Sequence, residues 1–79
     1  MMAMDEVETR LLEAINARLG ASPALSDALA SLGVDSVKMA DFIMTIEEQF
    51  DIRVDQEIWD VETVGELAAY IRARRPTEA

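Results

Sequence analysis

The fold of this 79-residue chain is decided by the stretch Leu32-Gly33-Val34-Asp35-Ser36-Val37 and the periodic segment after it, which ends Ile46-Glu47-Glu48-Gln49-Phe50. Gly33 interrupts the preceding pattern, and a helix is expected to begin at Asp35-Ser36 and to end near Phe50. Either Asp35 or Ser36 can cap this helix, because both side chains accept hydrogen bonds from free first-turn amides. Its core-facing stripe is predicted to consist of Met39, Ile43, Ile46 and Phe50.

Two further apolar residues of this helix fall outside the stripe. Val37 and Met44 lie a quarter turn or more away, close to Asp41 and Glu48. An apolar pair fringed by carboxylates on a solvent-facing side indicates a docking surface, to which methionine adds an adaptable contact. The alternative is that both residues pack under a loop, since single exposed apolar residues are common.

An earlier helix is predicted from about Met4 to Leu19, followed by a stop at Gly20. The segment from Leu25 to Asp35 reads as a long loop with one short helical turn, from which leucines pack inward. The apolar residues of the first helix and of the loop are Met4, Val7, Leu11, Ile15, Leu19, Leu25, Leu29 and Leu32.

The rest of the chain predicts one short and one longer helix. Asp51-Ile52-Arg53-Val54 is too short and isolated for a sheet and is interpreted as a connector. Asp55 can cap a short helix that carries Ile58 and Trp59. Trp59 is expected to anchor this helix, and the alternative is that it serves as a platform for a ligand. Thr63 and Glu66 form a capping box for the last helix, and Pro76 ends it. The stripe of this last helix is Val64, Leu67, Ala68 and Ile71, and its C-terminal cations are Arg72, Arg74 and Arg75.

Together these elements predict an all-α, four-helix bundle with up-down long helices. It has three main helices, one short third helix and a long loop between the first two. A chain of this length is expected to be a single domain over 1–79, with an ordered core at about 4–74 and a loose tail at 76–79.

Composition restricts the function. The chain has 16 acidic and 7 basic residues and a formal charge of −9, which disfavours nucleic acid and membrane surfaces and favours basic protein faces. The alternative is that the acidity only aids solubility. Cysteine and histidine are both absent, so the usual nucleophile–base sites and zinc sites cannot be built, and no enzyme is expected.

No metal site and no export signal are expected. The carboxylates Asp51, Asp55, Asp60 and Glu62 do not fit a calcium loop, because Arg53 takes a ligand place and Gln56 replaces the central glycine. The acidic N-terminus lacks a continuous apolar run, and no stretch is long enough to span a membrane. A soluble, cytoplasmic protein is expected.

The run from Leu32 to Val37 and the helix after it closely resemble the acyl carrier protein family. The resemblance extends to the Asp-Ile-Arg-Val-Asp connector and to Thr63-Val64-Gly65-Glu66-Leu67, and so covers about Leu25 to Ile71. In that family the serine of this motif carries 4′-phosphopantetheine. The resemblance therefore implies Ser36 as the attachment residue, with Asp35 as its flanking residue. A phosphodiester there would face the positive end of the helix dipole.

The resemblance also implies partners. These are a phosphopantetheinyl transferase and an acyltransferase, ketosynthase or acyl/aminoacyl ligase with basic docking patches. The carrier itself is expected to be a monomer when it is not bound to a partner. The helix after the serine is the family's main recognition element. The implied docking residues here are Val37, Lys38, Asp41, Met44, Glu47 and Glu48, with Asp35 as a further charged contact.

Several residues of the helix after Ser36 depart from the pattern of fatty-acid carriers. Lys38 stands where an acidic or polar residue is common, and Asp41 replaces a glutamate; Met39-Ala40 is also unusual for these carriers. Asp-Ser-Val-Lys also resembles a run in some peptidyl carriers. We therefore expect a discrete carrier of polyketide or related secondary-metabolite biosynthesis. The alternatives are a primary fatty-acid carrier, an aminoacyl or peptidyl carrier, and an unmodified acidic helical adaptor.

Overall fold

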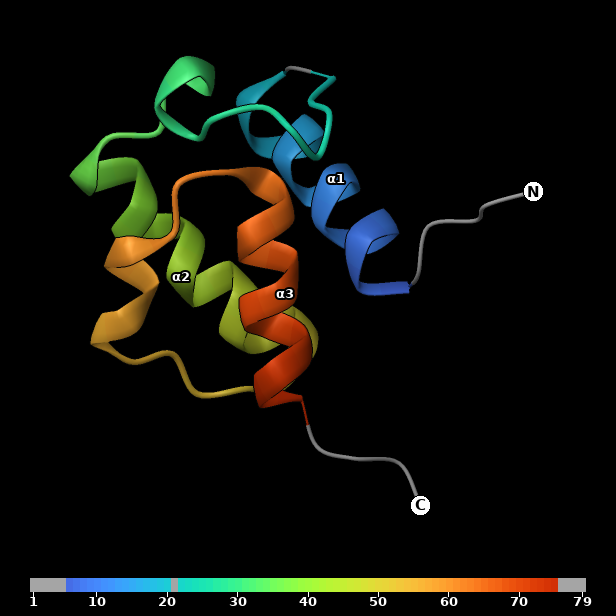
Figure 1. Ribbon diagram of the computed structural model, residues 1–79, viewed down its shortest axis with the longest axis vertical. Helices are drawn as coiled ribbons and strands as arrows, with labels where there is room; N and C mark the ends of the chain where they lie inside the picture. The colour runs from blue at the N-terminus through green and yellow to red at the C-terminus, as the bar shows by residue number, and fades with distance from the viewer. Residues whose placement is uncertain (1–5, 21, 76–79) are drawn as a thin grey trace.

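The computed structural model describes residues 6–20 and 22–75, which form three α-helices and two short 3-10 helices (Figure 1). This confirms the predicted all-α fold, in which the short third helix is of the 3-10 type. Between the described residues the only bridge of β type is an isolated pair, Ala28 and Thr63. The elements are α1 (Glu6–Leu19), η1 (Ala30–Leu32), α2 (Ser36–Phe50), η2 (Gln56–Asp60) and α3 (Val64–Arg74). Met4, Pro76 and the predicted tail at 76–79 lie outside the described residues.

The hydrophobic core lies where the three α-helices meet, and α1 packs beside α3. The predicted stripe of α3 is fully buried, and so is most of that of α1, although Leu19 is only half-buried. In α2 the prediction was partly wrong, because Phe42 is buried whereas Ile43 is half-buried. The buried sector of α2 extends toward α1, and Thr45, which lies on that side, is buried as well.

The start of α2 is set by its own sequence. Gly33 has a φ of 84°, a left-handed conformation that glycine adopts without the steric cost of a β-carbon. The backbone then turns into α2 at Asp35, whose side chain caps the helix. Asp35 rather than Ser36 is therefore the cap, which settles the two alternatives that the sequence leaves open.

The long loop packs inward through its leucines and is tied to the start of α3. Leu29 is buried, Leu25 and Leu32 are half-buried, and the Leu29 amide donates to the carbonyl of Glu62 at 2.8 Å. The Gly65 amide donates to the Leu25 carbonyl at 2.7 Å. A β-carbon at Gly65 would lie only 3.1 Å from that carbonyl oxygen, so glycine permits the close approach of loop and helix.

The connector and η2 follow the predicted order. Residues 51–55 form no strand, and the Asp55 carboxylate caps η2 by accepting from the Glu57 amide at 3.1 Å. Ile58 is fully buried, whereas Trp59 is 53% exposed. The expectation that Trp59 anchors η2 was wrong, because η2 is oriented so that Ile58 enters the core and Trp59 lies along the surface.

The capping box of α3 is confirmed. The Glu66 amide donates to the Thr63 hydroxyl at 3.1 Å, and the Glu66 carboxylate accepts in return from the Thr63 amide. No helix in the described ranges is both long enough and apolar enough to cross a membrane.

Candidate functional site

Ser36 is the first residue of α2, and its side chain is exposed. Because Asp35 accepts the Lys38 amide at 2.9 Å, the Ser36 hydroxyl is not engaged as the cap. The Met39 amide bonds to the Asp35 carbonyl at 2.8 Å and begins the regular helix. The serine hydroxyl is therefore presented to solvent from a fixed helical position.

The surroundings of Ser36 suit an attached phosphate. Within the described part of the chain, the amides of Ser36 and Val37 have no hydrogen-bond acceptor. These free amides and the helix dipole favour negative charge at this end of α2. A phosphodiester on the Ser36 hydroxyl would stand beside them without disturbing the Asp35 cap.

A groove with a volume of about 500 Å³ opens beside Ser36. Its walls come from the end of the long loop, the first turn of α2, and η2 with the segment that follows it. Most of its side chains are apolar. Its lining residues are Ala28, Leu29, Ala30, Val34, Asp35, Ser36, Met39, Trp59, Val61 and Glu62. An apolar arm or cargo attached at Ser36 could lie along this groove and lose contact with water.

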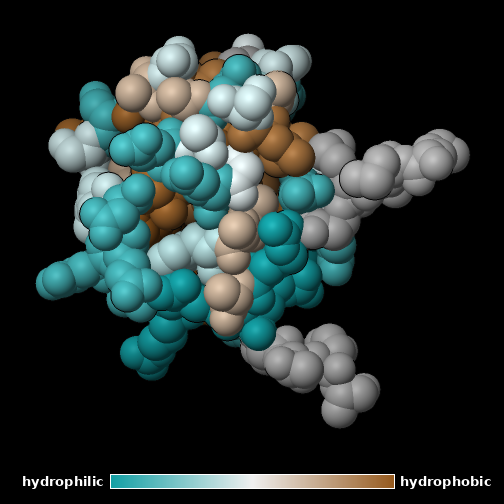
Figure 2. All heavy atoms as spheres, viewed as in Figure 1, coloured by the Kyte–Doolittle hydropathy of each residue, from teal (hydrophilic) through white to brown (hydrophobic). Residues whose placement is uncertain are grey.

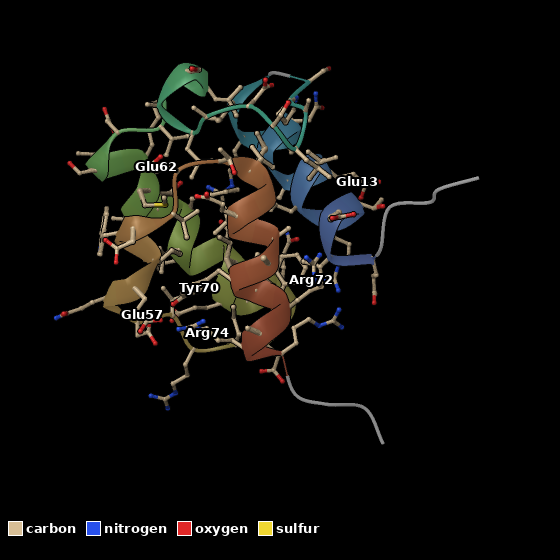
Figure 3. All side chains as sticks on the ribbon, viewed as in Figure 1. Glu13, Glu57, Glu62, Tyr70, Arg72 and Arg74 are labelled. Atoms are coloured by element: carbon tan, nitrogen blue, oxygen red, sulfur yellow. The ribbon has the colours of Figure 1, made fainter. Side chains whose placement is uncertain are left out.

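A polar cluster ties η2, one wall of this groove, to α3. The Tyr70 hydroxyl donates to the Asp55 carboxylate at 2.7 Å, and the Arg74 guanidinium lies 3.7 Å from the centre of the Tyr70 ring. Arg74 also pairs with Asp55 at 3.0 Å and with Glu57 at 2.9 Å. Figure 3 shows Tyr70 and Arg74 reaching from α3 toward Glu57 on η2. The hydrogen bonds from Tyr70 and then from Arg74 lower the pKa of Asp55, so this carboxylate stays ionised at neutral pH.

The outward face of α2 is exposed as predicted. Val37 is 75% exposed and Met44 is 62% exposed, so the alternative that they pack under the long loop is wrong. Asp41 and Glu48 are exposed on the same side of the helix. We call Val37, Asp41, Met44 and Glu48 the α2 ridge.

Two of the predicted docking carboxylates, Glu47 and the ridge residue Asp41, already have partners within the chain. Glu47 is half-buried and accepts the Val54 amide at 2.9 Å, so it holds the connector against α2. Asp41 forms an ion pair with Arg18 of α1 at 2.7 Å. Glu48 and Lys38 are both exposed.

Sequence reasoning missed Arg18 and Tyr70. Arg18 lies three residues after the buried Ile15, at the edge of the packed face of α1, and that spacing was the available signal. Tyr70 is buried and precedes Ile71 in the stripe of α3, but its bond to Asp55 joins residues fifteen apart. Nothing local in the sequence indicates that contact.

The carboxylates considered for calcium do not gather in the structure. Across residues 6–20 and 22–75, no group of three or more acidic side chains is arranged to hold a metal ion. Asp55 instead bonds to Tyr70 and Arg74.

On the face that Figure 2 shows, hydrophilic side chains dominate around α3.

The site thus combines an exposed serine at the start of a helix with an adjoining apolar groove in a small helical bundle. The family model for the phosphopantetheine attachment site matches residues 9–71. The chain belongs to the acyl carrier protein family. The group that this family carries is 4′-phosphopantetheine, bound covalently to a serine, and its members carry acyl groups rather than catalyse reactions.

Relatives and a solved structure agree with this assignment. The acyl carrier protein of Renibacterium salmoninarum is 30% identical over 76 residues, which cover 90% of this chain and 94% of that protein. That of Wolinella succinogenes is 28% identical over 76 residues, covering 95% of this chain and all of the relative. The crystal structure of the acyl carrier protein from Thermotoga maritima matches with a TM-score of 0.72 at 19% identity, covering 91% of this chain and 94% of that one. The structural match supports the fold.

Proposed function

We propose that Ser36 is the attachment residue and that this single-domain chain delivers a thioester-bound acyl group to biosynthetic enzymes. The observation that carries the proposal is the position of the Ser36 hydroxyl. It is exposed and not engaged as the helix cap, and it adjoins both the free amides of α2 and the apolar groove. When bound, the phosphopantetheine arm supplies the thiol that forms the thioester. The chain's own residues hold the attachment point and leave it accessible to partner enzymes.

The preferred setting is a discrete carrier of polyketide or related secondary-metabolite biosynthesis. Lys38 supports this choice, because it places a cation two residues after Ser36 on an exposed surface. A carrier of primary fatty-acid synthesis is the second candidate, and the names of the relatives suit it equally well. An aminoacyl or peptidyl carrier is the third.

In this proposal the carrier works in the cytoplasm as a monomer. It meets a phosphopantetheinyl transferase and then an acyltransferase, ketosynthase or ligase. The α2 ridge supports such encounters, because exposed valine and methionine flanked by carboxylates suit a partner face with apolar and basic side chains. Asp35 and Glu47 are less available to a partner, because Asp35 caps α2 and Glu47 holds the connector.

The test is the intact mass of the chain after incubation with coenzyme A and a broad-specificity phosphopantetheinyl transferase. The parent is expected to gain one phosphopantetheine, and Ser36→Ala is expected to gain none. Ser31→Ala is the matched control, because it removes another exposed hydroxyl and should leave the gain intact. If the parent gained no mass with several transferases, an unmodified acidic adaptor would replace the carrier as the conclusion.

Loading of the modified chain then separates the pathways. Transfer of a malonyl group by a malonyltransferase would favour the polyketide and fatty-acid settings. Loading by an adenylating ligase would favour the aminoacyl or peptidyl setting.

A further inference from the structure

The α2 ridge is bordered by cations on the side that faces α1. Arg18 reaches across from α1, and its guanidinium contacts the Asp41 carboxylate at 2.7 Å and donates to the Thr45 hydroxyl. Its side chain remains 45% exposed. The charge of Asp41 is therefore offset within the chain, and a cation stands beside it at the surface.

Lys38 extends this border toward the attachment residue. It is exposed, and no carboxylate in the described ranges pairs with its ammonium group. Lys38 and Arg18 line the same small hollow of about 140 Å³, together with Asp41. We call Arg18 and Lys38 the basic edge.

The surface therefore carries charge of two signs in a fixed order along α2. Lys38 lies two residues after Ser36, and Arg18 stands beside Asp41 and Thr45 in the middle of α2. The exposed Glu48 lies twelve residues after Ser36, toward the other end. Since Asp41 is already paired with Arg18, Glu48 is the ridge carboxylate that has no ion-pair partner in the described ranges.

We propose that the basic edge selects the partner enzyme. The surface fits a partner that presents carboxylates opposite Lys38, near the point where the arm enters its active site, and opposite Arg18 at the middle of α2, with a cation opposite Glu48. It disfavours a partner whose docking patch is basic throughout. This inference rests on the proposed function and makes Arg18, a residue of α1, a specificity residue for docking.

The physical reason is that specificity comes from repulsion of wrong partners as well as attraction of the right one. A cation of the carrier placed against a cation of the partner costs affinity, and charge at the rim of an interface acts mainly on the association rate. The effect of exposed charges is modest and is screened as the ionic strength rises.

The test uses modification at Ser36 by a broad-specificity phosphopantetheinyl transferase chosen for a basic carrier-facing surface. With coenzyme A saturating, Lys38→Glu is expected to raise kcat/KM about three- to tenfold at low salt, and the gain should shrink at about 0.5 M salt. Arg18→Gln should raise it less, because only one charge is removed. Glu48→Lys should lower it. Glutamate near the start and lysine near the end of α2 both suit the helix dipole, so these variants are expected to fold.

The matched control is Arg53→Glu, which changes the net charge as Lys38→Glu does but lies beyond the other end of α2. At about 0.1 M salt, where the Debye length is about 10 Å, it should leave kcat/KM within about twofold of the parent, because Arg53 lies more than that distance from the basic edge along α2. An equal rise in Arg53→Glu would overturn the proposal, because overall charge would then explain the result. An unchanged or lower rate for Lys38→Glu would overturn it too.

Attraction is tested with transferase variants in which single carrier-facing basic residues are replaced by glutamate. At least one of these variants should modify the parent faster than Lys38→Glu, which reverses the order seen with the unmodified transferase. If no variant reversed that order, the proposed attraction between the basic edge and a partner carboxylate would be refuted. Failure of the parent to gain mass at all would instead overturn the proposed function, and this inference with it.

Discussion

Replacement of Ile58 by alanine should destabilise the domain far more than replacement of its neighbour Trp59. Ile58 is the only buried residue of η2, with no exposed surface, whereas Trp59 is 53% exposed over the groove. The pair therefore tests which side chain fixes η2, the groove wall beside Ser36.

The magnitude follows from the buried volume that is lost. Ile58→Ala removes three carbons, each worth about 0.8 kcal/mol of transfer free energy. The cavity that remains brings the loss in the free energy of unfolding to about 3 kcal/mol or more. The total for a chain of this size is about 4–12 kcal/mol. Trp59→Ala should lower the free energy of unfolding by about 1 kcal/mol, because the side chain borders an open groove and its removal leaves no closed cavity.

The assay is urea denaturation followed by far-UV circular dichroism. Fluorescence cannot serve for both variants, because Trp59 is the single tryptophan of the chain. The midpoint of Ile58→Ala should fall strongly with an unchanged slope, which would indicate a loss of stability within a two-state transition. An equal loss of stability in Trp59→Ala, or a larger one, would refute the reasoning and restore Trp59 as the anchor.

Two other predictions concern polar contacts. Asp35→Ala should lower the free energy of unfolding by about 1 kcal/mol through loss of the α2 cap. Asp35→Asn can still accept from the Lys38 amide and should keep most of that stability. Equal thermal unfolding of the two variants would contradict the capping role. Tyr70→Phe removes the hydrogen bond that contributes most to the lowered pKa of Asp55. A depressed pKa stabilises the fold above the unfolded value of about 3.9 and ceases to do so as the pH falls through the folded value. The difference in stability between parent and Tyr70→Phe should therefore be largest near neutral pH and shrink below about pH 4, and a difference that grew on acidification in pH-dependent urea titrations would argue against the contact.

Features that depend on residues three or four apart could be predicted from the sequence. The spacing of apolar residues located all three α-helices, and the caps of η2 and α3 followed from Asp55 and the Thr63–Glu66 pair. For α2 the sequence offered Asp35 or Ser36, and the structure shows Asp35 as the cap. The exposure of Val37 and Met44 was also predicted, because it depends only on their angle from the core stripe around one helix.

The details of the site depended on contacts between elements. Phe42 is buried in place of Ile43 because α1 packs along one side of α2, and periodicity within α2 cannot show which side a neighbour covers. In the same way, η2 places Ile58 rather than Trp59 in the core, since packing against the bundle sets its rotation.

The sequence by itself determined the helices, the caps of η2 and α3, and the position of Ser36 at the start of α2. Only the tertiary structure decided the charge of the surface around that serine. The Arg18–Asp41 pair spans 23 residues and the Tyr70–Asp55 bond spans 15. Such contacts arise from the way packed helices are placed beside one another, and no local spacing in the chain encodes that placement.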